Sequence, residues 1–293
     1  MSYKAPKKAI ITDAGFASRY LPITKTIPKA MVPIGAKPVM QLCIEECVAA
    51  GIEEIIIVAT PNSKAKEIYD NYFHNEAKNI EALLTKQGKA KRFEPVKDIL
   101  NFPKITVIEQ DASLPYGNGS PIASAKSFIN DDEAFVVLYS DDLVFGTPAV
   151  KELLEAFEKH PDATAIIAGQ MVPHEEIKKY ASIDYDKDTE ILNGLVEKPA
   201  PEDAASDLAS YGRYLLTPEV FKFLSPDHTG LDGELWTADA IASLIPTGHV
   251  YVRETTGTWM TTGDPKNYFL AHLKYVLENT DYADDVREFI KNN

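Results

Sequence analysis

A basic, proline-punctuated stretch near the N-terminus carries the residue types best suited to binding phosphate. A small-residue turn at 14–18 (Ala-Gly-Phe-Ala-Ser) leads into a loop that holds Arg19, Lys25 and Lys29. Backbone N–H groups of such a turn can cradle a phosphate, and three prolines in the loop restrict where the cations point. The segment therefore predicts a site for a small anionic ligand. A surface loop with scattered lysines is the alternative, and composition alone does not separate the two.

Acidic and mixed-charge pairs further along the chain form a second set of candidates. Asp141 and Asp142 end one apolar run, and Glu197 and Lys198 end another. Side chains alternate along a strand, so Asp141 and Asp142 are expected to point to opposite faces and only one of them to face a ligand. Taken alone, each pair also has an ordinary structural explanation, as a turn or as an exposed surface pair.

The charge balance excludes broad polyanionic partners. The chain has 293 residues, with 30 Lys and Arg against 44 Asp and Glu, and a formal net charge of −14. Such a chain is poorly suited to coating nucleic acid or an anionic membrane. Residues 1–40 differ from the rest, because they hold seven bases and one acid. This local excess of positive charge again favours a small anionic ligand.

Cysteine usage and hydropathy indicate a reducing, cytoplasmic setting. Cys43 and Cys47 lie four residues apart on one face of an expected helix, and no His or Cys cluster lies near them in sequence. Two buried thiols are therefore favoured over a metal pair. No apolar run has the length of a signal peptide or of a membrane span. We expect no membrane partner.

Short apolar runs alternate with helical patterns, which predicts an α/β fold with a parallel sheet in three layers. In the first half we expect strands at 7–12, 53–60, 104–110 and 133–142, and helices at 38–50, 63–74 and 121–129. In the second half we expect strands at 164–171, 191–198, 209–216 and 249–254, and helices at 233–245 and 266–279. Residues 75–103 are interpreted as an excursion from the core. Ligands of such sheets bind outside the carboxyl ends of the strands, where the candidate residues lie.

The basic segment resembles the signature of the sugar nucleotidyltransferases, G-x-G-T-R followed by L-x-P-x-T-x-x-x-P-K. It is most similar to the version in bacterial UTP–glucose-1-phosphate uridylyltransferases, T-K-x-I-P-K-x-M-x-P. The matching positions are Arg19, Leu21, Pro22, Thr24, Lys25, Pro28, Lys29, Met31 and Pro33. The similarity continues in the family's order through SDDLV, VEKP, YGRYLLTPE, GELWTADAI and TGDPKNYFLAHLKY. It covers nearly the whole chain.

The resemblance implies a three-layer, Rossmann-like nucleotidyltransferase fold, with a mostly parallel central sheet and a smaller sugar-binding part. We expect a single domain with a nucleotide-binding half at 1–145, a sugar-phosphate-binding half at 146–265 and a helical tail at 266–293. The implied reaction joins UTP and glucose 1-phosphate to give UDP-glucose and pyrophosphate by direct displacement, with Mg²⁺ as cofactor. Such a reaction needs positioning and charge neutralisation rather than a covalent intermediate.

Five residues are assigned to nucleotide binding by their match to the family pattern. Ala14 and Gly15 are expected to meet the uracil or ribose through their backbone, and Lys25 to lie close to the triphosphate. Gln110 and Gly117 are expected to read the edge of the uracil. The signal for these residues is their joint order, since none of them is informative alone.

Four residues are assigned to the reaction itself. Arg19 and Lys29 are expected to hold the triphosphate, and Lys198 to neutralise the sugar phosphate and the α-phosphate. Asp141 is the expected Mg²⁺ ligand, with Asp142 as the neighbour that could replace it. A metal ion of this kind keeps several waters and relies on substrate phosphates.

Two residues are assigned to the sugar, and other segments to assembly. Glu197 is expected to accept hydrogen bonds from sugar hydroxyls, and Gly212 to let the sugar approach the backbone closely, although Gly212 could instead serve strand packing. Family members are commonly homodimers or homotetramers. Residues 75–103 and the C-terminal helix are candidates for such contacts.

Several departures from the family pattern fall in the expected site, including Trp236, which stands where the family has a glutamine. Ala17 stands where the family has a second glycine, Thr261 where it has an aspartate that is often the second metal ligand, and Asp13 where it has a small apolar residue. We hypothesise that Asp13 compensates for the aspartate missing at Thr261. The departures keep two alternatives open: a related enzyme for another nucleotide or hexose 1-phosphate, and a weakly active regulatory paralogue that binds a nucleotide sugar.

Overall fold

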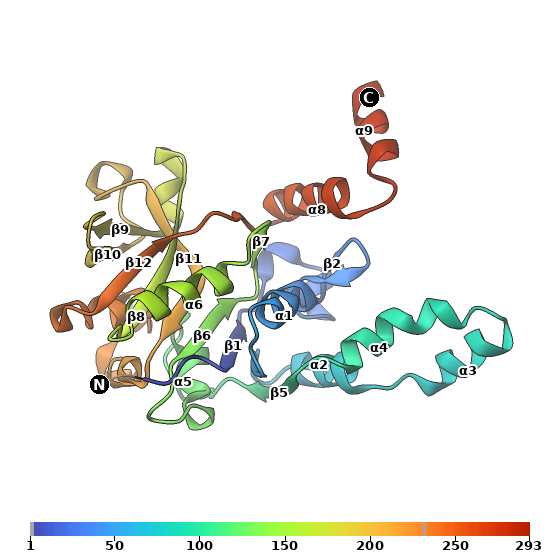
Figure 1. Ribbon diagram of the computed structural model, residues 1–293, viewed down its shortest axis with the longest axis horizontal. Helices are drawn as coiled ribbons and strands as arrows, with labels where there is room; N and C mark the ends of the chain where they lie inside the picture. The colour runs from blue at the N-terminus through green and yellow to red at the C-terminus, as the bar shows by residue number, and fades with distance from the viewer. Residues whose placement is uncertain (1–2, 231–232) are drawn as a thin grey trace.

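The computed structural model describes residues 3–230 and 233–293, and its main feature is a nine-stranded sheet with helices on both faces (Figure 1). The strands are β1 Lys8–Asp13, β2 Pro33–Ile34, β3 Lys37–Pro38, β4 Glu54–Ala59, β5 Lys104–Glu109, β6 Phe135–Tyr139, β7 Asp142–Phe145, β8 Ala165–Met171, β9 Ala181–Tyr185, β10 Leu192–Glu197, β11 Leu208–Leu216, β12 Val250–Glu254 and β13 Thr258–Thr261. The helices are α1 Val39–Ala49, α2 Ala65–His74, α3 Lys78–Lys86, α4 Glu94–Leu100, α5 Ser120–Ser124, α6 Ala149–Lys159, α7 Thr237–Ala242, α8 Pro265–Asn279 and α9 Ala283–Asn292. The α/β class predicted from the sequence is confirmed.

The relative direction of neighbouring strands changes along the sheet, whose strand order is β10-β9-β11-β6-β1-β4-β5. In the first half β5, β4, β1 and β6 are mutually parallel. In the second half β11 runs antiparallel to β6, β8 and β9, and β12 pairs with β8 in parallel. The nine residues of β11 are all buried, because this strand joins the two halves into one sheet. The carboxyl ends of β1, β4 and β6 meet at one edge, where loops are free to form a site.

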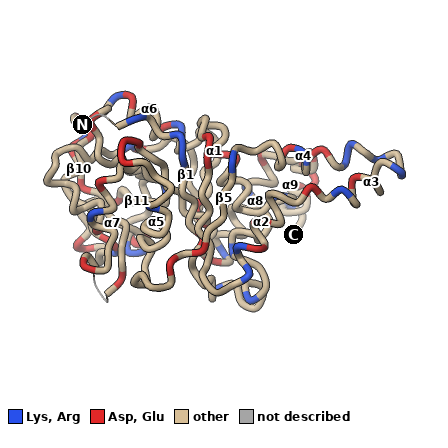
Figure 2. Tube along the Cα trace, turned by 90° about the horizontal axis from the view of Figure 1, so that it is seen from below, with Lys and Arg blue, Asp and Glu red and all other residues tan. Residues whose placement is uncertain are grey.

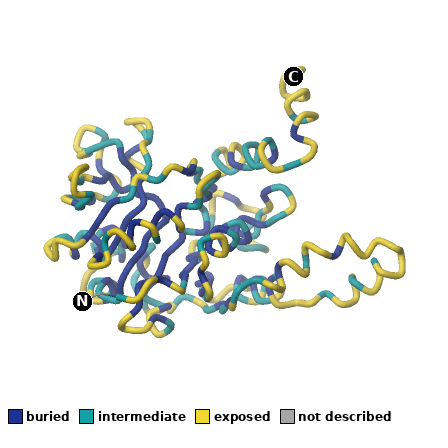
Figure 3. Tube along the Cα trace, viewed as in Figure 1, coloured by how far each residue is buried: buried dark blue, intermediate teal, exposed yellow. Residues whose placement is uncertain are grey.

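Both faces of the parallel strands are buried, which explains their continuous apolar runs. One face of β4 carries Ile55 and Ile57 toward α1, α2 and α6, and the other carries Ile56 and Val58 toward α5 and α7. Cys43 and Cys47 are free and buried in the first of these layers, as predicted. Figure 3 shows this buried centre as a continuous band through the sheet.

An exposed helical arm leaves the body of the molecule between α2 and β5, where the sequence predicted an excursion (Figures 1 and 3). No residue of α3 is buried, whereas Phe93 and Ile99 are buried close to α4. Figure 2 shows basic and acidic residues mixed along the arm, and the C-terminal α9 is likewise almost wholly exposed. None of the helices in the described ranges is long and apolar enough to cross a membrane.

The predicted boundaries are wrong at two places near the site. The strand expected at 133–142 ends at Tyr139, and Asp142 begins the separate strand β7, which pairs with β13. The helix expected at 233–245 begins only at Thr237 and ends at Ala242. Helix α6 and strands β7, β9 and β13 were not predicted. The turn between β6 and β7 is what places two adjacent acids in different surroundings.

Candidate active site

Three adjoining cavities lie along the carboxyl edge of the parallel strands. The loop cavity, about 470 Å³, is lined by the turn after β1, the basic loop and the N-terminus of α2. The central cavity, about 670 Å³, lies over the ends of β1 and β6, and the distal cavity, about 510 Å³, continues from it toward β9 and β11. Lys29 lines the first two cavities, and Asp141 and Lys198 line the last two. The three cavities therefore form one continuous site.

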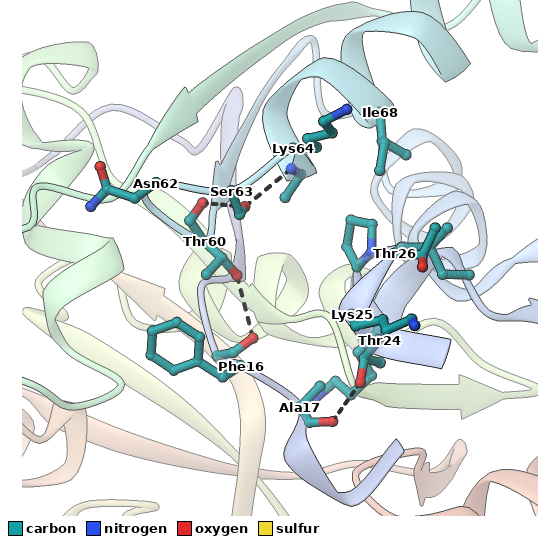
Figure 4. Close-up of a pocket in the computed structure, with 15 residues that line it drawn as sticks. Phe16, Ala17, Thr24, Lys25, Thr26, Thr60, Asn62, Ser63, Lys64 and Ile68 are labelled. Atoms are coloured by element: carbon teal, nitrogen blue, oxygen red, sulfur yellow. Dashed lines mark hydrogen bonds between the residues drawn. The ribbon is translucent and has the colours of Figure 1, made fainter. Parts of the chain in front are cut away.

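The loop cavity is held open by hydrogen bonds between side chains and backbone (Figure 4). Thr24 donates through Oγ1 to the carbonyl of Ala17 at 2.9 Å, and Thr60 donates to the carbonyl of Gly15 at 3.3 Å. Ser63 Oγ accepts the backbone N–H of Ala65 at 3.1 Å, which caps the first turn of α2. These bonds fix the turn after β1 against the start of α2, and Lys25 and Lys64 line the space between them.

An ion pair between Lys29 and Asp141 stands at the centre of the site. Nζ of Lys29 lies 2.6 Å from Oδ2 of Asp141. Burial opposes the charge on both groups, but their mutual attraction prevails, so the pKa of Asp141 is lowered and that of Lys29 is raised. The pair therefore stays ionised and presents one cation and one carboxylate to the central cavity.

Asp13 is buried beside this pair and has partners of its own. Its Oδ1 accepts a hydrogen bond from Ser140 Oγ at 2.8 Å, and Tyr69 donates to Oδ2. Burial raises the pKa of Asp13, and the nearby charge of Lys29 opposes that rise. Both carboxylate oxygens are thus engaged by hydroxyl groups. The structure gives no support to the hypothesis that Asp13 replaces the carboxylate missing at Thr261.

Asp141 and Asp142 have different hydrogen-bond partners because the turn between β6 and β7 separates them, and not through the strand alternation assumed from the sequence; both line the distal cavity. Asp142 Oδ2 accepts the backbone N–H of Gly212 at 2.9 Å, and its Oδ1 accepts the indole N–H of Trp259 at 2.7 Å. Burial, together with the charge of Asp141, raises the pKa of Asp142 to about 6. Asp141, rather than Asp142, is the carboxylate that meets Lys29.

A fully buried ion pair behind this turn was not predicted. Arg213, which is 0% exposed, makes two-pronged contacts with Glu46, including one of 2.8 Å from Nη2. Its guanidinium also donates to the carbonyls of Tyr139 at 3.3 Å and Asp142 at 2.7 Å, on either side of Asp141. An arginine inside the nine-residue apolar run of β11 is the sequence signal that could have indicated this contact.

The structure brings most of the predicted site residues together. The central cavity is lined by Ala14, Gly15, Lys29, Gln110, Gly117, Asp141 and Lys198. The distal cavity adds Arg19, Glu197 and Gly212. Lys25 lines the loop cavity only. Arg19 lines the distal cavity, whereas Lys29 lines the loop and central cavities; Arg19 is exposed and donates to the carbonyl of Gly263 at 3.3 Å.

Backbone geometry at three positions shows why a glycine is present or expected there. Ala17 has φ 46°, so the position where the resemblance expected glycine does adopt the left-handed conformation. Gly117 has φ 135°, and an added Cβ would lie 2.3 Å from the carbonyl oxygen of Leu235. At Gly212 an added Cβ would lie 2.3 Å from Cβ of Tyr139. The geometry favours the packing explanation for Gly212, and its contact with a sugar stays a prediction.

The ends of β10 and α7 close the site on the sugar side. Burial raises the pKa of Glu197, whose Oε1 lies 3.6 Å from Nζ of Lys198. Lys198 has φ 46°, and its ammonium lies 4.2 Å from the ring centroid of Trp236. Trp236, to which the sequence analysis gave no role beyond that of a departure from the family pattern, lines both the central and the distal cavity.

The donor set suits a divalent cation that takes few protein ligands. Within residues 3–230 and 233–293, no group of three or more acidic, His or Cys side chains is arranged to hold a metal ion. Thr261 lies beside Asp141, with its hydroxyl 3.4 Å from the carbonyl of Asp141. Asp141 lines the central cavity together with Asp13 and Glu234, and Asp13 is already engaged by Ser140 and Tyr69. Oxygen donors of this kind suit a hard divalent cation whose remaining ligands are phosphate oxygens and water.

Comparison with known proteins agrees with this geometry. Residues 8–278 match the nucleotidyl transferase family. UTP–glucose-1-phosphate uridylyltransferase 2 of Staphylococcus saprophyticus is 37% identical over 290 residues, covering 97% of each chain. A UTP-bound UGPase from Acinetobacter baumannii has a TM-score of 0.85 at 28% identity, over 97% of this chain and 98% of that one. A UDP-glucose pyrophosphorylase complexed with UDP-glucose has a TM-score of 0.79 at 29% identity, over 92% and 98%.

The chain therefore belongs to the nucleotidyl transferase family. Its mixed α/β sheet is that of a nucleotidyl-transferring enzyme.

Proposed function

We propose that the protein transfers uridylate from UTP to glucose 1-phosphate, giving UDP-glucose and pyrophosphate. The observation that carries the proposal is the Lys29–Asp141 pair in the central cavity, where Lys29 also borders the loop cavity and Asp141 also borders the distal one. Relatives and structural neighbours of nearly full length are named for this reaction or for its substrate and product. A site made of cations, backbone donors and a carboxylate held by a lysine suits phosphoryl chemistry without a covalent intermediate.

In the proposed reaction, a phosphate oxygen of the sugar 1-phosphate attacks the α-phosphorus of UTP, and pyrophosphate leaves. Gln110 and Gly117 bind the uracil from the central cavity, and the backbone of Ala14 and Gly15 meets the nucleoside. Lys25 borders the loop cavity, which is the space that the β- and γ-phosphates would fill. These contacts fix the nucleotide so that its α-phosphate lies beside Lys29.

The acceptor binds in the distal cavity under the proposal. Glu197 accepts hydrogen bonds from sugar hydroxyls, and Gly212 lies in the wall against which the sugar rests. Lys198 lines both cavities, so its ammonium can neutralise the sugar phosphate and the α-phosphate together. Arg19 lies on the same side, close to Gly263, and is assigned to the phosphates that span the two cavities.

Enzymes of this family generally use a divalent metal ion, and we assign Mg²⁺ to Asp141. The ion supplies neutralisation of the charge that develops on the phosphate oxygens. Lys29 holds the carboxylate of Asp141 in position at the edge of the central cavity and keeps it ionised.

Assembly as a homodimer or homotetramer is part of the proposal. Large apolar side chains are exposed on the arm and on the C-terminal helices; they include Ile80, Leu83, Phe269, Leu270, Phe289 and Ile290. Sedimentation of the purified chain tests it, and a monomer at micromolar concentration contradicts it. A cytoplasmic location remains the expectation drawn from the cysteine usage.

Pyrophosphate release over a panel of nucleotides and sugar phosphates tests the function. Turnover with UTP and glucose 1-phosphate in the presence of Mg²⁺ is expected, and it should exceed turnover with other nucleotides. The K198M variant is expected to lose activity on the order of 100-fold, as for removal of one preorganised group at a developing charge. K126M, which changes a lysine outside the three cavities, is the matched control.

Two outcomes would replace the proposal. Turnover only with another nucleotide or hexose 1-phosphate would assign a related specificity. Tight binding of UDP-glucose without turnover, with Mg²⁺ present, would make the protein a regulatory paralogue, the alternative that Thr261 and Ala17 favour.

A further inference from the structure

The ammonium of Lys198 rests on an aromatic face rather than in a cage of carboxylates. Its Nζ lies 4.2 Å from the centroid of the Trp236 ring and 3.6 Å from Oε1 of Glu197. The backbone N–H of Lys198 donates to the carbonyl of Tyr180 at 3.0 Å, and its φ of 46° turns the side chain away from the line of β10. The side chain is about half exposed, so its position depends on these few contacts.

Trp236 is itself fixed from both sides. Leu235, the residue before it, donates its N–H to the carbonyl of Tyr116 at 2.7 Å and accepts the N–H of Gly119 at 2.9 Å. Thr237, the residue after it, donates its N–H to Oδ1 of Asn118 at 2.8 Å. The loop around Gly117 is thereby joined to the start of α7, which fixes the backbone that carries the indole in the wall shared by the central and distal cavities.

An aromatic face holds a cation without neutralising it. The quadrupole of the indole attracts the ammonium from one side, and it uses none of the three N–H donors. Glu197 already supplies one carboxylate at 3.6 Å, and a second one in place of the indole would cancel more of the positive charge and repel phosphate. A lysine placed in this way keeps its charge and most of its donors for a ligand in either cavity.

We infer that Trp236 is a positioning residue that holds Lys198 at the junction of the nucleotide and sugar-phosphate spaces. The inference rests on the proposed function for the identity of the ligand, and on the observed contact for the pairing of the two side chains. Trp236 acts through Lys198, so its contribution requires the lysine.

A double-mutant cycle between the two residues tests this inference. W236L is expected to lower kcat/KM for uridylyl transfer on the order of 10-fold, because the lost cation–π attraction lets the flexible lysine sample other positions. W236F and W236Y keep an aromatic face and are expected to stay within about 3-fold of the unchanged protein. In a K198M background, W236L is expected to cause no further loss.

Affinity for UDP-glucose, measured by calorimetry on the same variants, provides a readout that does not depend on turnover. The same coupling is expected there: W236L weakens binding in the presence of Lys198 and not in its absence. W236M, with a large and flexible apolar side chain, replaces W236L if the leucine variant does not fold. K126M, which breaks the Lys126–Phe221 contact of 5.9 Å outside the site, is the control for loss of a cation–π contact.

The outcomes separate the inference from the proposed function. Equal losses from W236L with and without Lys198 would mean that the indole contacts the ligand directly or only supports the fold, and would overturn the inference. Full activity of W236L would also overturn it. Absence of uridylyl transfer in the unchanged protein would remove the proposed function, while the coupling in UDP-glucose affinity would still decide the role of Trp236.

Discussion

The basic loop after β1 and the turn between β6 and β7 face each other across the site, yet they are built differently. In the loop, Phe16 is 71% exposed, Arg19 and Lys25 are exposed, and Ala17 holds a left-handed conformation. In the turn, Ser140 and Asp142 are buried and hydrogen-bonded.

The difference indicates a division of tasks. Arg213 and Glu46 fix the turn from behind, so Asp141 is in place before a substrate arrives, as electrostatic preorganisation requires. The exposed cations of the loop lose conformational freedom when a phosphate orders them, which lowers the net gain from each contact. The turn thus holds Asp141 in a fixed position, whereas the cations of the loop can change position to contact the ligand.

The largest expected effect comes from breaking the buried Arg213–Glu46 pair that supports the turn between β6 and β7. R213M leaves Glu46 buried without its partner, so the free energy of unfolding should fall by about 3–5 kcal/mol. Urea unfolding followed by circular dichroism measures it. K104M, which breaks an exposed pair with Glu54, is the control and should change stability by less than about 1 kcal/mol. A loss that small in R213M would contradict the role given to the buried pair.

The second-largest effect is expected from removing Lys29, the lysine of the basic loop that pairs with Asp141 in the turn between β6 and β7. K29M is expected to reduce kcat on the order of 100- to 1000-fold, equivalent to about 2.7–4 kcal/mol, because it removes a fixed charge from the reacting phosphate. Steady-state pyrophosphate release measures the change. K7M, on an exposed lysine paired with Glu53, is the matched control. A rate within about 3-fold of the unchanged protein would move the reaction centre elsewhere.

The buried turn is also expected to make stability depend on pH. The pKa of Asp142 is about 6 in the folded protein, against about 3.9 for an unfolded aspartate. Between these values the folded state holds a proton that the unfolded state has released. Stability should therefore be highest below about pH 4 as far as this group is concerned, and fall by about 3 kcal/mol as the pH rises from 4 through 6.

Unfolding in urea between pH 4 and 7.5 measures this dependence. D142N cannot titrate, so it should remove the part of the slope due to Asp142, whatever its effect on absolute stability. Asp13, whose pKa burial also raises, acts in the same direction and should leave a remaining slope. Identical slopes for D142N and the unchanged protein would assign the pH dependence to other groups.

The smallest expected effect is in the loop itself. Ala17 at φ 46° is strained by an amount on the order of 1 kcal/mol, so A17G should raise the free energy of unfolding by about 0.5 kcal/mol after allowance for the freer unfolded chain. Ala77, with φ 47° before α3, is a matched position on the exposed arm. Urea unfolding of A17G and A77G compares the two, and a loss of stability in A17G would show that the methyl group packs usefully.

Local patterns in the sequence were enough for the parallel half of the fold and for much of the site. Continuous apolar runs identify β1, β4 and β5, and order along the chain places Lys29, Asp141 and Lys198 at one edge. The short β7 was missed because its apolar run merges with that of β6, and only the turn at 140–141 separates them.

The missed contacts depend on distant segments. Arg213 and Glu46 are 167 residues apart, and no local spacing indicates that they pair. Arg19 and Lys29 were both assigned to the triphosphate by the family resemblance; in the fold Arg19 donates to the carbonyl of Gly263, and its role at the triphosphate stays a prediction. Trp236 was noted only as a departure from the family pattern, and its meaning depends on where the end of β10 brings Lys198.

The helical arm has few buried contacts, and this has a consequence for hydrogen exchange. Backbone amides of α3 depend on helix hydrogen bonds that no buried side chain protects, whereas those of β1 and β4 open only when the central sheet does. The arm should thus exchange its amide hydrogens through local opening, at a free-energy cost far below that of global unfolding. It behaves as a separate cooperative unit, and contacts with another chain would appear there first as slowed exchange.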